Sequence, residues 1–200
     1  MGSSDIFTKY PTEHEWSFWI DQYPGPNKMP EEYAKSQKCV GKFKDIQNMW
    51  RWVNSFPPAS LPYGYSYTIM KENIRPLWED SNNKDGMTFS IRVNYKDLDD
   101  NIINLIWWNL IASVVGESLS FTDNINGISI SFRDSNVVFN IWNASANQKY
   151  IHQIEKELVP ILQELTTETL NLFTKRHDPS ALKFRYVKTH SSKSLYMPSY

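Results

Sequence analysis

The 200-residue sequence has a single cysteine, Cys39, and no excess of positive charge. One cysteine allows neither an internal disulfide nor a cysteine-based metal cluster, which suits a reducing compartment: the cytoplasm, with a nuclear fraction also compatible. The 21 basic and 22 acidic side chains leave a formal net charge of −1. Any binding of nucleic acid is therefore expected to be local and directed at bases, rather than driven by phosphate neutralisation. The longest apolar run, 102–115, is too short and too interrupted for a membrane span.

The sequence also lacks the common signatures of catalysis. It contains no glycine-rich phosphate loop, no zinc-ligand spacing and no G-x-S-x-G elbow. The four histidines lie far apart, without a serine or cysteine nucleophile signature near them. These absences predict a protein that is not an enzyme and that needs no cofactor or metal. An enzyme acting on methylated guanine nucleotides stays an alternative without supporting residues.

Aromatic residues are what the sequence has in abundance, at 14% of the chain with eight tryptophans. Most are expected to fill the core, but aromatic rings on loops can also stack on nucleic-acid bases. Rings that lie outside periodic segments are therefore the candidates for binding.

The hydrophobic pattern indicates an α+β fold in one domain. Strands occur in clusters joined by turns or single helices, without a βαβ rhythm, which predicts one antiparallel sheet with helices packed on one face. We expect a flexible arm over 1–13, a domain over 14–190 and a mobile tail over 191–200. The expected strands are 15–23, 34–43, 63–70, 87–94, 127–134, 136–143 and 182–189. A loop is expected over 24–33, and helices over 46–56, 97–115 and 147–173, the last kinked or interrupted near Pro160.

Residues 71–86, "KENIRPLWEDSNNKDG", place a tryptophan in a polar loop. Pro76 restricts the backbone before Trp78, and turn-forming residues follow. An indole face attracts flat cationic rings, and the Glu79 carboxylate can accept from two adjacent N–H donors, such as those on the edge of guanine. On these residues alone, Trp78 could equally anchor its loop to the sheet, with Glu79 in solvent.

The chain resembles the translation initiation factor 4E family, which binds the 7-methylguanosine cap of messenger RNA. The pieces that carry the resemblance are "YPTEHEWSFW" (10–19), "VGKFKDIQNMWRWVN" (40–54), "YSYTIMKENIRPLWEDSNNKDG" (65–86), "GESLS" (116–120) and "SFRDSNVVFNIW" (131–142). The resemblance implies a curved antiparallel sheet, three helices on its convex back and the cap in its concave front.

Cap-binding residues follow from the resemblance position by position. Trp78 matches a tryptophan that stacks on the base, and Glu79 matches the acid that reads guanine. Trp142 matches the tryptophan against the N7 methyl group, and Arg133 matches an arginine that binds phosphate. Tyr33 stands at the position of the first stacking tryptophan.

Departures from the family pattern concern this tyrosine and the phosphates. Tyr33, after a longer loop, resembles a divergent branch that includes cap-binding translational repressors. Val138, Thr88 and Ser135 stand where the family has basic residues, which predicts weak recognition of the triphosphate.

The resemblance also implies a protein partner on the convex face. Family members bind a helix there with the motif Tyr-x-x-x-x-Leu followed by an apolar residue, carried by a scaffold such as initiation factor 4G or by a repressor. The adjacent Trp107 and Trp108 cannot both point into one core, so one should face outward. The positions that match the family's partner site are Pro11, Ile46, Trp50, Trp108 and Ala112. Ordinary packing of helix on sheet remains the alternative for most of them.

Two functional readings remain open at this point. The first is a cap-binding protein that acts in translation initiation or its regulation. The second is an interaction scaffold or translational repressor of the same fold that binds the cap weakly.

Overall fold

The computed structural model of the protein describes residues 9–23, 30–94, 99–133, 135–173 and 183–188. Seven strands form one sheet in the order β2-β1-β3-β5-β6-β4-β7, with antiparallel pairing throughout. The strands are β1 (Pro11–Gln22), β2 (Lys38–Asp45), β3 (Tyr65–Lys71), β4 (Met87–Asn94), β5 (Ile125–Arg133), β6 (Asn136–Asn143) and β7 (Lys183–Lys188).

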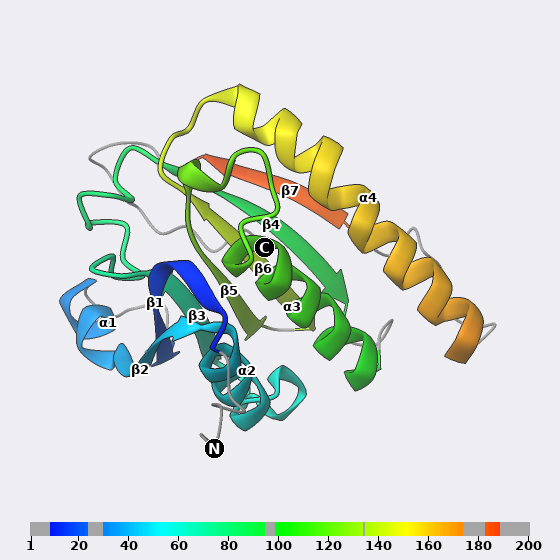
Figure 1. Ribbon diagram of the computed structural model, residues 1–200. Coiled ribbons are helices and arrows are strands. Elements are labelled where there is room, and N and C mark those ends of the chain that lie inside the picture. The colour runs from blue at the N-terminus through cyan, green and yellow to red at the C-terminus, as the bar shows by residue number, and fades with distance from the viewer. Residues whose placement is uncertain (1–8, 24–29, 95–98, 134, 174–182, 189–200) are drawn as a thin grey trace, which may run out of the picture.

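Three helices cover one face of the curved sheet, as Figure 1 shows. They are α2 (Ile46–Ser55), α3 (Asp100–Val115) and α4 (Gln148–Phe173), while the short α1 (Pro30–Ser36) lies to the side, beside β1. Two 3-10 turns, Pro58–Ser60 and Thr122–Asn124, complete the described elements. The α+β architecture expected from the sequence is confirmed.

Two helices begin at aspartates that cap them. The Asp45 side chain accepts a hydrogen bond from the backbone N–H of Asn48 at 2.7 Å and so caps α2. The Asp99 side chain accepts from the N–H of Ile102 at 3.0 Å, so α3 starts at Asp100 rather than at the expected residue 97. Residues 95–98 lie outside the described part of the chain.

The expected elements differ from the structure at three other places. Residues 30–36 form a helix, where the sequence reading expected the end of a loop and the start of a strand. Pro30 at the helix start, two glutamates in the first turn and Lys35 in the last are local helix signals that outweigh the nearby prolines. β1 begins at Pro11, so residues 11–13 belong to the sheet, and α4 is not interrupted at Pro160. The expected tail over 191–200 lies outside the described residues.

Alternation along the strands gives the sheet two different faces. The face toward the helices is apolar, and Phe18, Ile69, Phe89 and Phe139 on it are completely buried. The opposite face, called the polar face below, carries mainly small polar side chains and two tryptophans. Because paired residues in an antiparallel sheet point to the same side, the register orders this face into three rungs.

These rungs run across β1, β3, β5, β6 and β4. The first rung is Ser17, Met70, Gly127, Trp142 and Thr88; the second is Trp19, Thr68, Ser129, Asn140 and Ser90; the third is Asp21, Ser66, Ser131, Val138 and Arg92.

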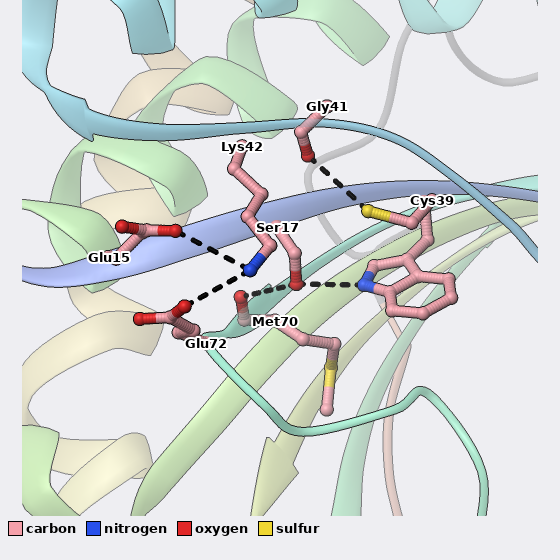
Figure 2. A network of polar contacts seen from close by, with 8 residues as sticks. Glu15, Ser17, Cys39, Gly41, Lys42, Met70 and Glu72 are labelled. Atoms are coloured by element: carbon pink, nitrogen blue, oxygen red, sulfur yellow. Dashed lines mark hydrogen bonds and ion pairs between the residues drawn. The ribbon is translucent and has the colours of Figure 1, made fainter.

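Hydrogen bonds fix the β1 end of the polar face. Figure 2 shows Ser17 bonded to the carbonyl of Met70 at 3.2 Å, and the same hydroxyl accepts from the indole N–H of Trp19 at 2.8 Å. At the edge, the Lys42 ammonium lies 3.0 Å from Glu72 and 3.6 Å from Glu15. None of the helices in the described part of the chain is both long and apolar enough to span a membrane.

Candidate functional site

The loop that carries Trp78 connects β3 to β4 and is held by its own polar side chains. The Asp80 carboxylate accepts from the backbone N–H groups of Arg75, at 3.0 Å, and Asn82, at 2.9 Å. Burial acts to raise the pKa of Asp80, but these hydrogen bonds outweigh it and hold the pKa below its ordinary value. Asp80 is therefore a structural part of the loop.

A buried asparagine ties the same loop together from inside. Asn83 is 1% exposed, and its amide donates to the carbonyls of Arg75 and Leu77, both at 2.8 Å. Asn126 on β5 donates in turn to Asn82 and to Asn83, at 2.7 and 2.9 Å. The backbone around Trp78 is thus fixed to the sheet at several points.

Glu79 differs from the acid next to it. Its side chain is exposed, and no hydrogen bond or ion pair joins its carboxylate to the described part of the chain. The loop is therefore held by Asp80, while the carboxylate of Glu79 faces solvent.

The two tryptophans predicted for the cap site lie together in the structure. Trp78 is half-buried and stacks on Trp142, with ring centroids 4.3 Å apart and an angle of 27° between the planes. Trp142 belongs to the first rung of the polar face and is 8% exposed. Segments more than 60 residues apart in sequence thereby share one aromatic surface.

Tyr33, the third predicted ring, is placed by α1. The helix is joined to the Trp78 loop, because Gln37 donates to the carbonyl of Pro76 at 2.7 Å and Arg75 donates to the carbonyl of Ala34 at 3.2 Å. Among the ring contacts of the described residues there is none between Tyr33 and Trp78. The two rings are on elements in contact, but the rings themselves do not touch.

The hydroxyl of Tyr33 points to a buried acid instead. It lies within hydrogen-bonding reach of Asp21 and Gln37, and burial, together with the negative charge of Asp21, raises the pKa of the tyrosine. Asp21 is itself 2% exposed, and burial raises its pKa to about 6. The sequence reading missed Asp21, although alternation in β1 places it on the same face as Ser17 and Trp19.

The polar face includes two arginines: Arg133, which the sequence analysis predicted as a phosphate-binding residue, and Arg92, which it missed. Arg133, at the end of β5, holds its guanidinium 5.4 Å from the centre of the Tyr23 ring, and its charge acts on Asp21. Arg92 lies directly opposite Val138 in the third rung, and its buried Nε has no hydrogen-bond partner. The alternation in "MTFSIRVN" places Arg92 on the same face as Thr88, and this was the signal that could have identified it.

The convex face shows how the predicted partner residues lie. Trp107 is completely buried, whereas Trp108 is half-buried and still packs against the core, so the two adjacent tryptophans differ in burial. Trp50 on α2 is half-buried, whereas Trp52 on the same helix stacks on Phe18 and Phe56, each at 6.1 Å.

The other three predicted partner residues are Pro11, Ile46 and Ala112. Pro11 is exposed and pairs with Asp45, the cap of α2, which places it next to Ile46 at the start of that helix. Ala112 is exposed on α3. Of the predicted partner residues, Pro11 and Ala112 are thus exposed, whereas Ile46, Trp50 and Trp108 are partly buried against the core.

No cluster of metal-ligating side chains occurs within the described ranges.

Comparison with known proteins gives a match over most of the chain. Residues 11–192 match the family model described as "Eukaryotic initiation factor 4E". Eukaryotic translation initiation factor 4E of Candida albicans is 31% identical over 157 residues, which cover 78% of this chain and 74% of that protein. The factor of Eremothecium gossypii is 28% identical over 176 residues, covering 86% and 80%.

Solved structures share the fold at lower identity. The complex of Ascaris suum eIF4E-3 with m2,2,7G cap has a TM-score of 0.72 and 20% identity, covering 94% of this chain and 96% of that one. The complex of C. elegans eIF4E-3 with the 4E-binding protein Mextli and cap analog has a TM-score of 0.69 and 23% identity, covering 90% and 93%.

Proposed function

The chain belongs to the eukaryotic initiation factor 4E family, and we propose that it binds the 7-methylguanosine cap of messenger RNA and acts in translation initiation or its regulation. It works by binding and carries out no reaction on the cap. The observation that carries the proposal is the loop held to the sheet by hydrogen bonds. This loop stacks Trp78 on Trp142 and leaves the neighbouring Glu79 exposed.

Each group of this surface has a chemical task in the proposal. The indole of Trp78 stacks on the positively charged base, where stacking and cation–π attraction act together. Glu79 accepts from the two N–H donors of the guanine edge, and a carboxylate makes such hydrogen bonds stronger than a neutral acceptor does. Trp142 contacts the methyl group of the base.

Tyr33 closes the slot from α1 in this proposal. In the free protein one face of Trp78 is covered by Trp142, and the Tyr33 hydroxyl is directed toward Asp21. In the proposal the base takes the face of Trp78 that Trp142 covers, so binding exchanges the Trp78–Trp142 stack for a stack on the cationic base. The exchange favours methylated guanine, because a neutral base offers less in return for the lost indole contact.

The phosphates are recognised by few cations. Arg92, in the third rung, and Arg133, two residues beyond Ser131 on β5, are the basic side chains that we assign to them. Val138 and Thr88, at positions where the family has basic residues, carry no charge. The triphosphate therefore contributes less to the binding free energy than the base does.

A partner helix binds on the convex face, separate from the cap. Trp50, with Ile46 on the same helix and Trp108 and Ala112 on α3, forms the surface for its leucine and following apolar residue. The partner is a scaffold of the initiation factor 4G type or a repressor with the same helical motif. Its identity decides between activation and repression.

The experiment that tests cap binding is calorimetry with 7-methyl-GTP and GTP. We expect the methylated nucleotide to bind much more tightly, and Trp78→Ala to weaken its binding by roughly 1–3 kcal/mol, the contribution of one base–aromatic stack. Glu79→Gln should weaken binding as well, whereas Asp85→Asn, an exposed acid of the same loop, serves as the matched control and should not.

Two outcomes would count against this function. Equal affinity for the methylated and unmethylated nucleotide would remove the cap as the ligand. Very weak binding of both, together with binding of a Tyr-x-x-x-x-Leu peptide, would instead support the scaffold alternative.

A further inference from the structure

A chain of hydrogen bonds on the polar face ends at the indole of Trp142. The Ser90 hydroxyl donates to Oδ1 of Asn140 at 2.6 Å, and Nδ2 of Asn140 donates to Oγ of Ser129 at 3.2 Å. The indole N–H of Trp142 donates to the same Oγ, also at 3.2 Å. In this relay β4 supplies Ser90, β5 supplies Ser129, and β6, which lies between them, supplies Asn140 and Trp142.

The relay has a fixed direction. Oδ1 of Asn140 accepts from Ser90, so the NH2 end of the amide faces Ser129. Ser129 is 5% exposed and receives both N–H donors on one oxygen. Because both of these donors belong to the sheet, the strands themselves set the position of Ser129 Oγ.

The indole of Trp142 is therefore held at its polar edge. Its N–H is buried, and a buried donor without an acceptor raises the free energy of the folded state. The ring is therefore kept in the orientation in which its N–H reaches Ser129. That orientation turns a ring face to Trp78, at 4.3 Å between centroids. Stacking depends on the relative planes of the rings, so the relay sets the geometry of the aromatic surface.

We propose that Ser129 and Asn140 are positioning residues for Trp142, and that they set how strongly the site discriminates methylated from unmethylated guanine nucleotides. Neither residue touches the base. They act by fixing the plane of the indole that faces Trp78 in the free protein and the methyl group in the complex. The inference rests on the proposed function for the identity of the ligand.

The strand itself offers a matched control for a test. Ser131 lies one rung from Ser129 on the same strand and the same face, and it is 3% exposed. Its Oγ has no hydrogen-bond partner. The variants Ser129→Ala and Ser131→Ala thus remove the same atom from similar surroundings, and only the first breaks the relay.

Two measurable quantities depend on the orientation of the Trp142 ring. The first is the circular dichroism couplet of the stacked indoles in the free protein. The second is the ratio of the dissociation constants of GTP and 7-methyl-GTP. Ser129→Ala should weaken the couplet and lower the ratio about fivefold, the effect of one lost hydrogen bond. Ser129→Thr, which keeps the hydroxyl, should restore both, and Ser131→Ala should leave both unchanged.

Equal effects of the two alanine variants, or no rescue by threonine, would overturn the proposal. If Ser129→Ala does not fold, Ser90→Ala replaces it, because that variant frees the Asn140 amide and is expected to lower the ratio in the same direction. A wild-type protein without preference for the methylated nucleotide would refute the proposed function, whereas the couplet in the free protein would still decide the role of Ser129.

Discussion

The buried carboxyl of Asp21 makes the stability of this protein depend on pH in a direction that can be calculated. Asp21 is 2% exposed, and Oδ2 has no hydrogen-bond partner. Burial raises its pKa from an ordinary 3.8 to about 6, although hydrogen bonds from Tyr33 and Ser66 and the charge of Arg133 act in the opposite direction. The folded state therefore favours the protonated carboxyl.

The size and the sign of the effect follow from this pKa. Between pH 3.8 and about 6 the folded protein holds a proton that the unfolded chain has lost, so the free energy of unfolding falls as the pH rises through this range. A pKa raised to about 6 corresponds to roughly 3 kcal/mol of stability that is present below the lower value and lost above the higher one.

Replacement by asparagine removes the titration and leaves a neutral side chain of the same shape. We expect Asp21→Asn to be more stable than the wild type at pH 7, by up to about 3 kcal/mol, and equal to it near pH 4. Urea denaturation of both proteins across this range gives the difference, in which the titration of all other groups cancels. Tyr33→Phe, which removes a hydrogen bond to the carboxylate, should move the transition to higher pH.

The reasoning would be refuted by a difference that does not change with pH, or by an asparagine variant that is less stable at pH 7. Asp85→Asn, at an exposed acid, is the control and should follow the wild type at every pH.

Three further predictions concern the phosphates, the partner and the core. Arg92→Ala and Arg133→Ala should each reduce the affinity gained between the mono- and triphosphate of the cap analogue in calorimetry; an unchanged gain would remove both from the phosphate site. Trp50→Ala should lose about 2 kcal/mol or more in binding of a Tyr-x-x-x-x-Leu peptide and leave cap binding unchanged, as expected for an aromatic anchor on the opposite face. Gly41→Ala should lower stability by roughly 1–3 kcal/mol in urea denaturation, a common cost of overpacking, because the new Cβ would lie 1.9 Å from the Trp52 ring; a neutral effect would mean that this ring moves freely.

Much of the fold was predictable because its signals are local. Alternation located most strands to within a few residues, and the hydrophobic pattern over 46–56 located α2. The short α1 was missed because three prolines and a glycine in 24–33 favoured a loop over the weaker signal of a seven-residue helix. Propensity decides little for so short a segment, and the contacts of Gln37 and Arg75 with neighbouring backbone fix it instead.

The candidate site was predictable in its residues and not in its contacts. The sequence singled out Trp78 by its loop context and Trp142 by the family resemblance, but not that the two rings stack on each other. It assigned no role to Asp80, and only the hydrogen bonds of the loop show that this acid holds the backbone around Trp78 and Glu79.

The sequence by itself determined which residues form strands and helices, which side of each strand is polar, and which residue types are available to recognise a cationic base. These properties depend on neighbours along the chain, through the period of each element and the chemistry of turns. Tertiary structure decided which of these residues meet. Ser90, Ser129 and Asn140 come from strands whose order in the sheet differs from their order in the sequence. Their alignment in one rung, and with it the orientation of Trp142, exists only once β4 and β5 have paired with β6.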